Sequence, residues 1–218
     1  MNRVTILGSA SAVPTVEHEN THLLVESGSR TVLVDCPGSP AVRLELVKVN
    51  PVRLTDLFLT HFHPDHVSGL APLLMGMWLV GRKAPLNIYA LEETIEWAVK
   101  MLELFQWDQW PGFYPVHFVR LPAEEHAIAL DDPDLRVYSS PVEHLIPTTG
   151  LRFEFRTTGR AAVYSGDTAP SQIVRRLAQG ADVLIHEATG PSRGHPPPEQ
   201  AGAIAAQAGV KSLYLIHY

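Results

Sequence analysis

The segment from Thr60 to Leu70 constrains this chain more than any other. It reads Thr-His-Phe-His-Pro-Asp-His-Val-Ser-Gly-Leu and follows the apolar run at 57–59, which has the pattern of a short buried strand. Polar groups that are buried beside such a strand are costly unless they are paired or bind a cation. The segment holds three imidazoles and one carboxylate, at His61, His63, Asp65 and His66.

The types and spacing of these side chains favour a metal site. Imidazole nitrogens and carboxylate oxygens are ligands that zinc prefers, and the end of a strand holds them rigidly. Side chains two residues apart on an extended segment point the same way, so His61 and His63 can share one ion. A turn after Pro64 can bring Asp65 and His66 to a second ion. The alternative is a histidine-rich surface loop, which the spacing and the preceding apolar run disfavour.

Length and composition predict one globular domain over residues 1–218. Hydrophobic residues make up 45% of the chain and charged residues 18%, which is typical of a globular protein. No apolar run is long enough to cross a bilayer, and no basic region precedes an apolar one at the N-terminus, so we expect a cytoplasmic protein with no membrane partner. The lone cysteine, Cys36, cannot form an internal disulfide, and we interpret it as a half-buried small apolar residue.

The formal net charge of −6 weighs weakly against a large nucleic-acid surface, which normally needs a basic face. The basic pairs Arg82-Lys83 and Arg175-Arg176 are interpreted as solvated charges. Bound divalent cations would make one site far more positive than the whole chain, so net charge says little about whether the substrate is anionic.

Apolar periodicity predicts strands and helices in two successive groups. The first group has expected strands at 4–7, 21–25, 31–34, 57–59 and 86–89, and expected helices at 41–47, 69–78 and 92–105. The second has expected strands at 117–121, 135–138, 151–155, 161–164, 183–185 and 213–216, and expected helices at 173–178 and 199–208. Two sheets back to back with helices outside accommodate this order. Residues 106–114 are interpreted as an aromatic loop that lines a pocket, with core packing as the alternative.

Further candidate ligands come just after later predicted strands. His144, Asp167 and His217 each lie shortly beyond such a strand, and His186 and Glu187 lie directly beyond another. Each of them alone is more typical of a turn or a helix cap. Strand ends along one edge of a sandwich can, however, bring them all to ions held by the first cluster.

Five motifs together resemble the metallo-β-lactamase superfamily, and within it the ribonuclease Z-like branch. They are Leu-Gly-Ser-Ala-Ser-Ala-Val-Pro at 7–14, His-Phe-His-Pro-Asp-His at 61–66, Ser-Gly-Asp-Thr at 165–168, His-Glu-Ala-Thr at 186–189 and Leu-Ile-His-Tyr at 215–218. The second motif is highly specific to the superfamily. The fourth, with the later Gly194-His195 and Pro198-Glu199, points more narrowly to the branch. The resemblance covers nearly the whole chain.

The resemblance implies an α/β fold, an αββα sandwich with two zinc ions at one edge. The implied ligands are His61, His63 and His144 for one ion, Asp65, His66 and His217 for the other, and Asp167 as the bridge between them. A bridging carboxylate is needed because two cations a few ångströms apart repel each other. Manganese and iron also accept these ligands.

The resemblance also implies catalytic roles. Asp65 is expected to orient the attacking water while it ligates a metal, and His195 to protonate the leaving oxygen. The alternative for His195 is a histidine of a surface loop. His186 and Glu187 are expected to support the metal ligands. The remaining histidines are interpreted as structural or exposed: His18, His22, His117 and His126.

Departures from the branch shape the substrate prediction. Members that mature tRNA carry a long flexible arm between the residues that match His144 and Asp167, whereas here 22 residues intervene, enough for a hairpin. The usual Asp-Cys-Gly also reads Asp-Cys-Pro-Gly at 35–38. We therefore expect a small-molecule substrate, a small or cyclic phosphodiester, and no extended nucleic acid. Relatives generally continue past the residue that matches His217, which suggests a trimmed sequence. The oligomeric state is open, with a homodimer as one option.

The leading hypothesis is thus a zinc-dependent phosphodiesterase. A lactonase or β-lactam hydrolase is a second hypothesis, because the same kind of centre also activates water against carbonyl carbon. A third is a metal-stabilised binding protein that does no chemistry. The complete ligand set and the candidate acid at His195 disfavour this third hypothesis.

Overall fold

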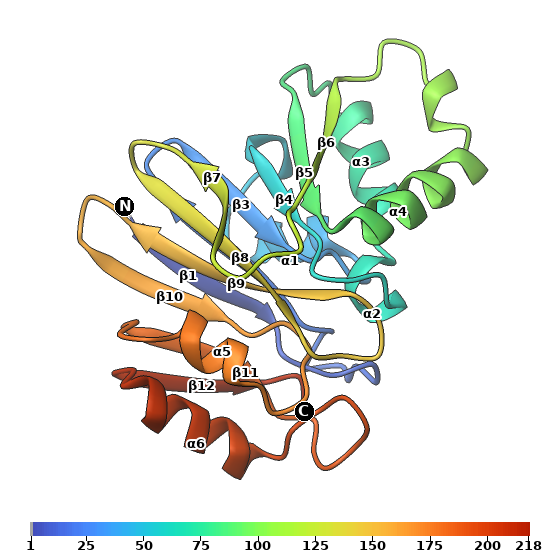
Figure 1. Cartoon of the computed structure of the whole chain (residues 1–218). Helices are drawn as coiled ribbons and strands as arrows, with labels where there is room; N and C mark the ends of the chain where they lie inside the picture. The colour runs from blue at the N-terminus through green and yellow to red at the C-terminus, as the bar shows by residue number, and fades with distance from the viewer. Residues whose placement is uncertain (1) are drawn as a thin grey trace.

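Two six-stranded sheets pack face to face in the computed structural model, which describes residues 2–218 (Figure 1). From edge to edge, the first sheet contains β1 (Asn2–Gly8), β2 (His22–Ser27), β3 (Arg30–Val34), β4 (Asp56–Phe58), β5 (Leu86–Ala90) and β6 (Val116–Arg120). The second contains β12 (Ser212–Ile216), β11 (Val183–Glu187), β10 (Arg160–Tyr164), β9 (Thr148–Phe155), β8 (Leu135–Val142) and β7 (Ala127–Asp131). The predicted αββα sandwich is confirmed.

Helices cover the outer face of each sheet (Figure 1). The first sheet is accompanied by α1 (Pro40–Leu46), α2 (Pro64–Val67), α3 (Leu70–Leu79), α4 (Glu92–Leu104) and the short 3-10 helices η1 (Pro51–Arg53) and η2 (Trp107–Gln109). The second is accompanied by α5 (Gln172–Leu177) and α6 (Pro198–Ala208). Among the described residues, no helix is long and apolar enough to span a membrane.

Alternating side chains along the strands divide the core into three layers. In β2, Leu23 and Val25 pack between the sheets, whereas Leu24 packs under the helices of the first sheet. In β10, Tyr164 faces the space between the sheets and Val163 faces α5 and α6. Strands that are apolar on both faces must be covered on both sides, which explains why the helices lie outside.

The parallel parts of the two sheets build the edge where the candidate ligands lie. Strands β3 to β6 run parallel in the first sheet, and β10 to β12 run parallel in the second. Parallel strands bring their carboxyl ends to one edge, where loops can carry polar side chains. The Thr149 amide donates to the Thr60 carbonyl at 3.1 Å and so joins the two sheets beside the histidine cluster.

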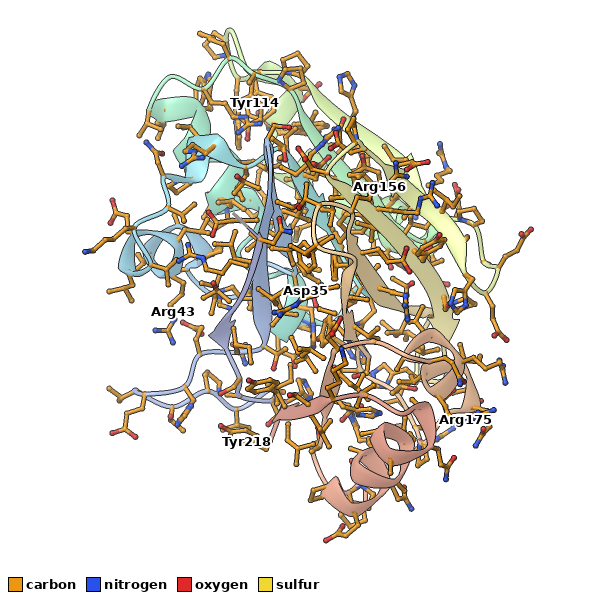
Figure 2. All side chains as sticks on the ribbon, turned by 90° about the vertical axis from the view of Figure 1, so that its left-hand side faces the viewer. Asp35, Arg43, Tyr114, Arg156, Arg175 and Tyr218 are labelled. Carbon is orange, nitrogen blue, oxygen red and sulfur yellow. The ribbon has the colours of Figure 1, made fainter. Side chains whose placement is uncertain are left out.

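Residues 106–114 pack against the core, so their interpretation as a pocket-lining loop is wrong. Trp110 stacks on Trp78 of α3 with ring centroids 5.4 Å apart, and the hydroxyl of Tyr114 donates to a carbonyl of α3 at 3.2 Å. Figure 2 shows Tyr114 at the opposite end of the molecule from Tyr218, which adjoins His217 in sequence. The aromatic rings therefore extend the core under α3 and α4, far from the candidate ligands.

Two residues are more buried than the sequence predicted. Cys36 is fully buried instead of half-buried, and burial raises the pKa of its thiol. Arg82, expected to be solvated, has only 4% of its surface exposed. Its guanidinium donates to four backbone carbonyls at 2.6 to 2.9 Å, those of Val52, Leu54, Ala84 and Pro85. The planar fork of five donors lets one side chain join these separate segments.

We expect Arg82→Met to lower the free energy of unfolding by about 3 kcal/mol, because buried carbonyls lose their donors. Urea denaturation followed by circular dichroism measures the change. The matched control is Lys83→Met, which removes a neighbouring exposed charge and should change stability by less than about 0.5 kcal/mol. Equal effects of the two substitutions would contradict a structural role for the guanidinium.

Candidate metal centre

The histidine cluster lies between the end of β4 and the first turns of α2. His61 is fully buried, and its Nδ1 lies 3.1 Å from the hydroxyl of Thr60. His63 is the residue that precedes α2, and Pro64 occupies the first position of that helix, where proline is favoured. The helical turn that follows directs Asp65 and His66 to a different place from the two preceding histidines.

The structure brings His61, His63 and His144 together. His63 Nδ1 lies 2.9 Å from His61 Nε2 and 3.3 Å from His144 Nε2. His144 is held from behind, because its Nδ1 donates to the carbonyl of Gly194 at 3.1 Å. Ring nitrogens this close repel each other unless a proton or a cation lies between them, so the trio fits a cation site.

A second group consists of Asp65, His66 and His217. The Nε2 of His217 lies 3.4 Å from Asp65 Oδ2, and the Nε2 of His66 lies 3.6 Å from the same oxygen. Candidate ligand atoms of these three side chains all lie within 4.8 Å of one another. His217 is fixed through its backbone, since its amide donates to the Ser9 carbonyl at 2.7 Å. The motif at 7–14 thus positions the last histidine of the chain.

Asp167 lies between the two groups. Its Oδ2 is 3.2 Å from His217 Nε2, 3.4 Å from His66 Nε2 and 3.9 Å from His61 Nε2. The residue is 2% exposed, and its other oxygen, Oδ1, has no hydrogen-bond partner among the described residues. The Nε2 of His66 is likewise buried without a hydrogen-bond partner there. Unpartnered buried atoms of these types fit a bound metal ion.

The pKa values of most of these side chains are shifted in the direction that favours metal binding. Burial lowers the pKa of His61, His63 and His144, which favours the neutral imidazole that ligates metals. Burial alone would raise the pKa of Asp167, but the surrounding imidazoles, His66 first, lower it well below its usual range and keep the carboxylate charged. Burial lowers the pKa of His66, yet Asp167 and Asp35 outweigh it and raise that pKa well above the ordinary value. His66 must therefore release a proton when a metal binds.

Asp35 is a functional residue that the sequence interpretation missed. Its Oδ2 accepts from His66 Nδ1 and from the Thr60 hydroxyl, both at 2.8 Å, and its Oδ1 accepts from the Thr60 amide at 2.8 Å. A carboxylate on the far nitrogen fixes the ring and directs Nε2 to the metal. The backbone of Asp35 is left-handed, with φ 59°, a sign of local strain. Figure 2 shows it near the middle of the molecule. Its signals in the sequence are its place directly after a predicted strand and at the start of the Asp-Cys-Pro-Gly motif.

His195 reaches the same centre from the loop between β11 and α6. Its Nδ1 lies 2.8 Å and 2.9 Å from the two oxygens of Glu187, a carboxylate that is fully buried. The hydrogen bond that His195 Nδ1–H donates to the Glu187 carboxylate raises the pKa of His195. Ligand atoms of His195 also lie within 4.8 Å of those of His144 and Asp167. His195 is thus a half-buried imidazole held at the rim of the centre.

Other histidines lie elsewhere. His186 bonds to the Glu187 carbonyl at 2.8 Å, and burial lowers its pKa to about 4. The Glu187 carboxylate lies nearer the candidate ligands: it accepts from the Thr189 hydroxyl at 3.0 Å, and that hydroxyl lies 2.7 Å from His217 Nδ1. His22 is buried and bonds to the Asn20 carbonyl. The remaining three, His18, His117 and His126, are exposed.

Comparison with known proteins identifies the family. The family described as "Beta-lactamase superfamily domain" matches residues 30–218. The Ribonuclease Z of Mycobacterium marinum is 31% identical to this chain over 100% of the chain and 86% of the relative. The chain belongs to the ribonuclease Z-like branch of the metallo-β-lactamase superfamily. It is therefore a hydrolase of the metallo-β-lactamase type, a class that implies a divalent metal.

Two relatives with lower sequence identity support the same family assignment. The Ribonuclease Z of Methanothermobacter thermautotrophicus is 26% identical over 100% of this chain and 86% of its own length. The crystal structure of the short form of human tRNase Z superposes with a TM-score of 0.84 at 26% identity, covering 100% of this chain and 92% of that one. The alignments to the two Ribonuclease Z proteins run over 245 and 275 residues, so these relatives carry insertions that this 218-residue chain lacks.

These relatives contradict one prediction. A small-molecule substrate, with no extended nucleic acid, was expected from the absence of the arm and of a basic face. Relatives that match the whole chain are instead named as ribonucleases, and one as a tRNase. The prediction was wrong because total charge does not report the charge of a site that holds divalent cations, and a missing arm removes only one contact surface.

We expect Asp35→Asn to lower the affinity for zinc about 10- to 100-fold, because an amide holds the His66 ring less firmly than a carboxylate does. Competition with a chromophoric chelator measures the dissociation constant. The control is Asp131→Asn, at an exposed carboxylate paired with Arg136, which should bind zinc like the wild type. Unchanged affinity in the Asp35 variant would mean that this carboxylate does not orient His66.

Proposed function

We propose that this protein is a ribonuclease that uses two zinc ions to hydrolyse RNA phosphodiesters. The observation that carries the proposal is the Asp167 carboxylate, which lies within 4 Å of imidazoles from both ligand groups. Similarity over the whole chain to proteins named Ribonuclease Z supports RNA as the substrate. The match to human tRNase Z makes tRNA the first class of RNA to test.

The proposed ligands are those that the motifs implied. They are His61, His63 and His144 for the first ion, Asp65, His66 and His217 for the second, and Asp167 for both. Two bound divalent ions would lower the pKa of water at the site and offset the charge that develops on the phosphoryl oxygens. Manganese or iron would suit the same nitrogen and oxygen donors.

Asp65 is the proposed orienting carboxylate for the attacking water. Its side chain is 14% exposed, whereas that of Asp167 is 2% exposed, so solvent reaches Asp65 more readily. One oxygen of Asp65 lies near His66 and His217. Its carboxylate can therefore ligate through one oxygen and accept a hydrogen bond from water with the other.

His195 is the proposed general acid. Glu187 anchors its Nδ1 and raises its pKa, which favours the protonated imidazole, and Nε2–H can give its proton to the leaving oxygen. The side chain of His195 is 15% exposed while that of Glu187 is fully buried, so only the histidine is accessible to a substrate. Glu187 acts through His195 and is a positioning residue.

Zinc-loaded protein should cleave a tRNA precursor, and a chelator should stop the cleavage reversibly. Gel analysis of end-labelled RNA detects the product. Hydrolysis of a homoserine lactone by the same preparation, without cleavage of any RNA, would contradict the proposal and favour an esterase.

Two substitutions separate metal binding from proton transfer. His63→Ala should abolish cleavage and lower the zinc content, because the first ion loses a ligand. His195→Ala should slow turnover about 100-fold or more and leave the zinc content unchanged. His117→Ala, at an exposed histidine of β6, is the control and should match the wild type in both. Elemental analysis and single-turnover rates supply the measurements, and zinc loss in the His195 variant would assign that residue to the metal instead.

A further inference from the structure

Two neighbouring hollows lie along α4, and the inner one is lined by His63 of the candidate metal centre. The inner hollow, of about 300 Å³, is lined by His63 and by residues of α4 and of the loop before β9. The outer hollow, of about 500 Å³, continues along α4 to Leu104. Phe62 and Trp97 line both hollows. We call this surface, from His63 to Leu104, the α4 groove.

Trp97 gives the groove an exposed aromatic face. The residue is 48% exposed, although a large aromatic side chain usually gains by burial. The ammonium group of Lys100, one helical turn further on, lies over one face of this ring, 4.6 Å from its centre. An accessible ring beside a cation is the combination with which proteins bind single-stranded nucleic acid, the ring under a base and the cation near a phosphate.

The charges in the groove favour a base over a run of phosphates. Glu93 lines the inner hollow, and Glu103 lines the outer one with Lys100, the single cation of the groove. Carboxylates repel phosphates, but they accept hydrogen bonds from the amino groups of bases. Phe62 and Trp97, which line both hollows, supply the apolar surface that suits a flat ring.

We propose that the α4 groove binds a nucleobase of the RNA substrate next to the scissile phosphodiester, stacked on Trp97. The groove starts at His63, a proposed ligand of the first metal, so a base in the inner hollow belongs to a nucleotide that flanks the cleaved bond. This proposal rests on the proposed ribonuclease function. It assigns Trp97 as a specificity residue that contacts the base and takes no part in the chemical step.

The test compares intact RNA with RNA that lacks one base. Two short substrates carry an abasic residue on the 5′ or the 3′ side of the mapped cleavage site. For the wild type, kcat/KM should fall about tenfold for one of the two, because a stacked base is lost. In Trp97→Ala the ratio between intact and abasic RNA should approach one. Trp97→Leu should behave in the same way, since it fills space without an aromatic face, and Trp97→Phe should keep most of the ratio.

A ratio of rates does not depend on the fraction of folded enzyme, so partial unfolding of a variant does not mimic the result. The control is Phe105→Ala, an exposed aromatic residue at the end of α4 outside the groove, which should keep the wild-type ratio. A wild-type ratio in both Trp97→Ala and Trp97→Leu would overturn the proposal. So would wild-type enzyme that is indifferent to both abasic residues.

Equilibrium binding separates this proposal from the ribonuclease function. Fluorescence anisotropy measures the dissociation constants of the same oligonucleotides in the presence of a chelator, where no cleavage is expected. If the wild type cleaved no RNA, the proposed ribonuclease function would be wrong. The dissociation constants would still show whether the α4 groove binds a base. If the wild type binds intact RNA more tightly than abasic RNA, and Trp97→Ala removes this difference, the result supports base binding in the α4 groove. Equal binding of both overturns it.

Discussion

A buried negative charge is the constraint on which the centre depends. The Asp167 carboxylate is almost fully enclosed, and such a charge is tolerated only where positive charge or donors surround it. Three imidazoles from two separate parts of the chain do this at 3.2 to 3.9 Å, those of His61, His66 and His217. When no metal is bound, the raised pKa of His66 favours the protonated imidazole, whose positive charge offsets the negative charge of the carboxylate. In the proposed two-metal state, the ions would supply this positive charge instead.

Several residues at the candidate metal centre have strained backbone conformations. Asp35 and His217 both adopt left-handed backbone angles, with φ 59° and φ 58°, which cost about 1 to 3 kcal/mol each for residues other than glycine. Gly166, just before Asp167, is also left-handed, and a Cβ atom there would lie 2.7 Å from the carbonyl oxygen of Thr149. Rigid sheets on both sides of the edge hold these conformations.

Much of this could be predicted from the sequence, because the period of two in the strands and the spacing of the ligands are local signals. Other features depend on contacts between distant segments, which no local pattern reports. The burial of Arg82 follows from four carbonyls that meet only in the folded chain. The role of Asp35 follows from the approach of His66. The aromatic segment at 106–114 was interpreted as a pocket-lining loop because it has no period, yet Trp110 packs on α3. The nucleic-acid substrates that the names of its relatives indicate were missed, because net charge averages over the whole surface.

The most direct test of the account is the metal content of active protein. Native mass spectrometry of freshly purified, RNA-cleaving protein should show two divalent transition-metal ions per chain, and activity should return with the second ion when stripped protein is titrated with zinc. Full cleavage activity in protein that contains no transition metal, and that keeps this activity when a chelator is added, would contradict the account.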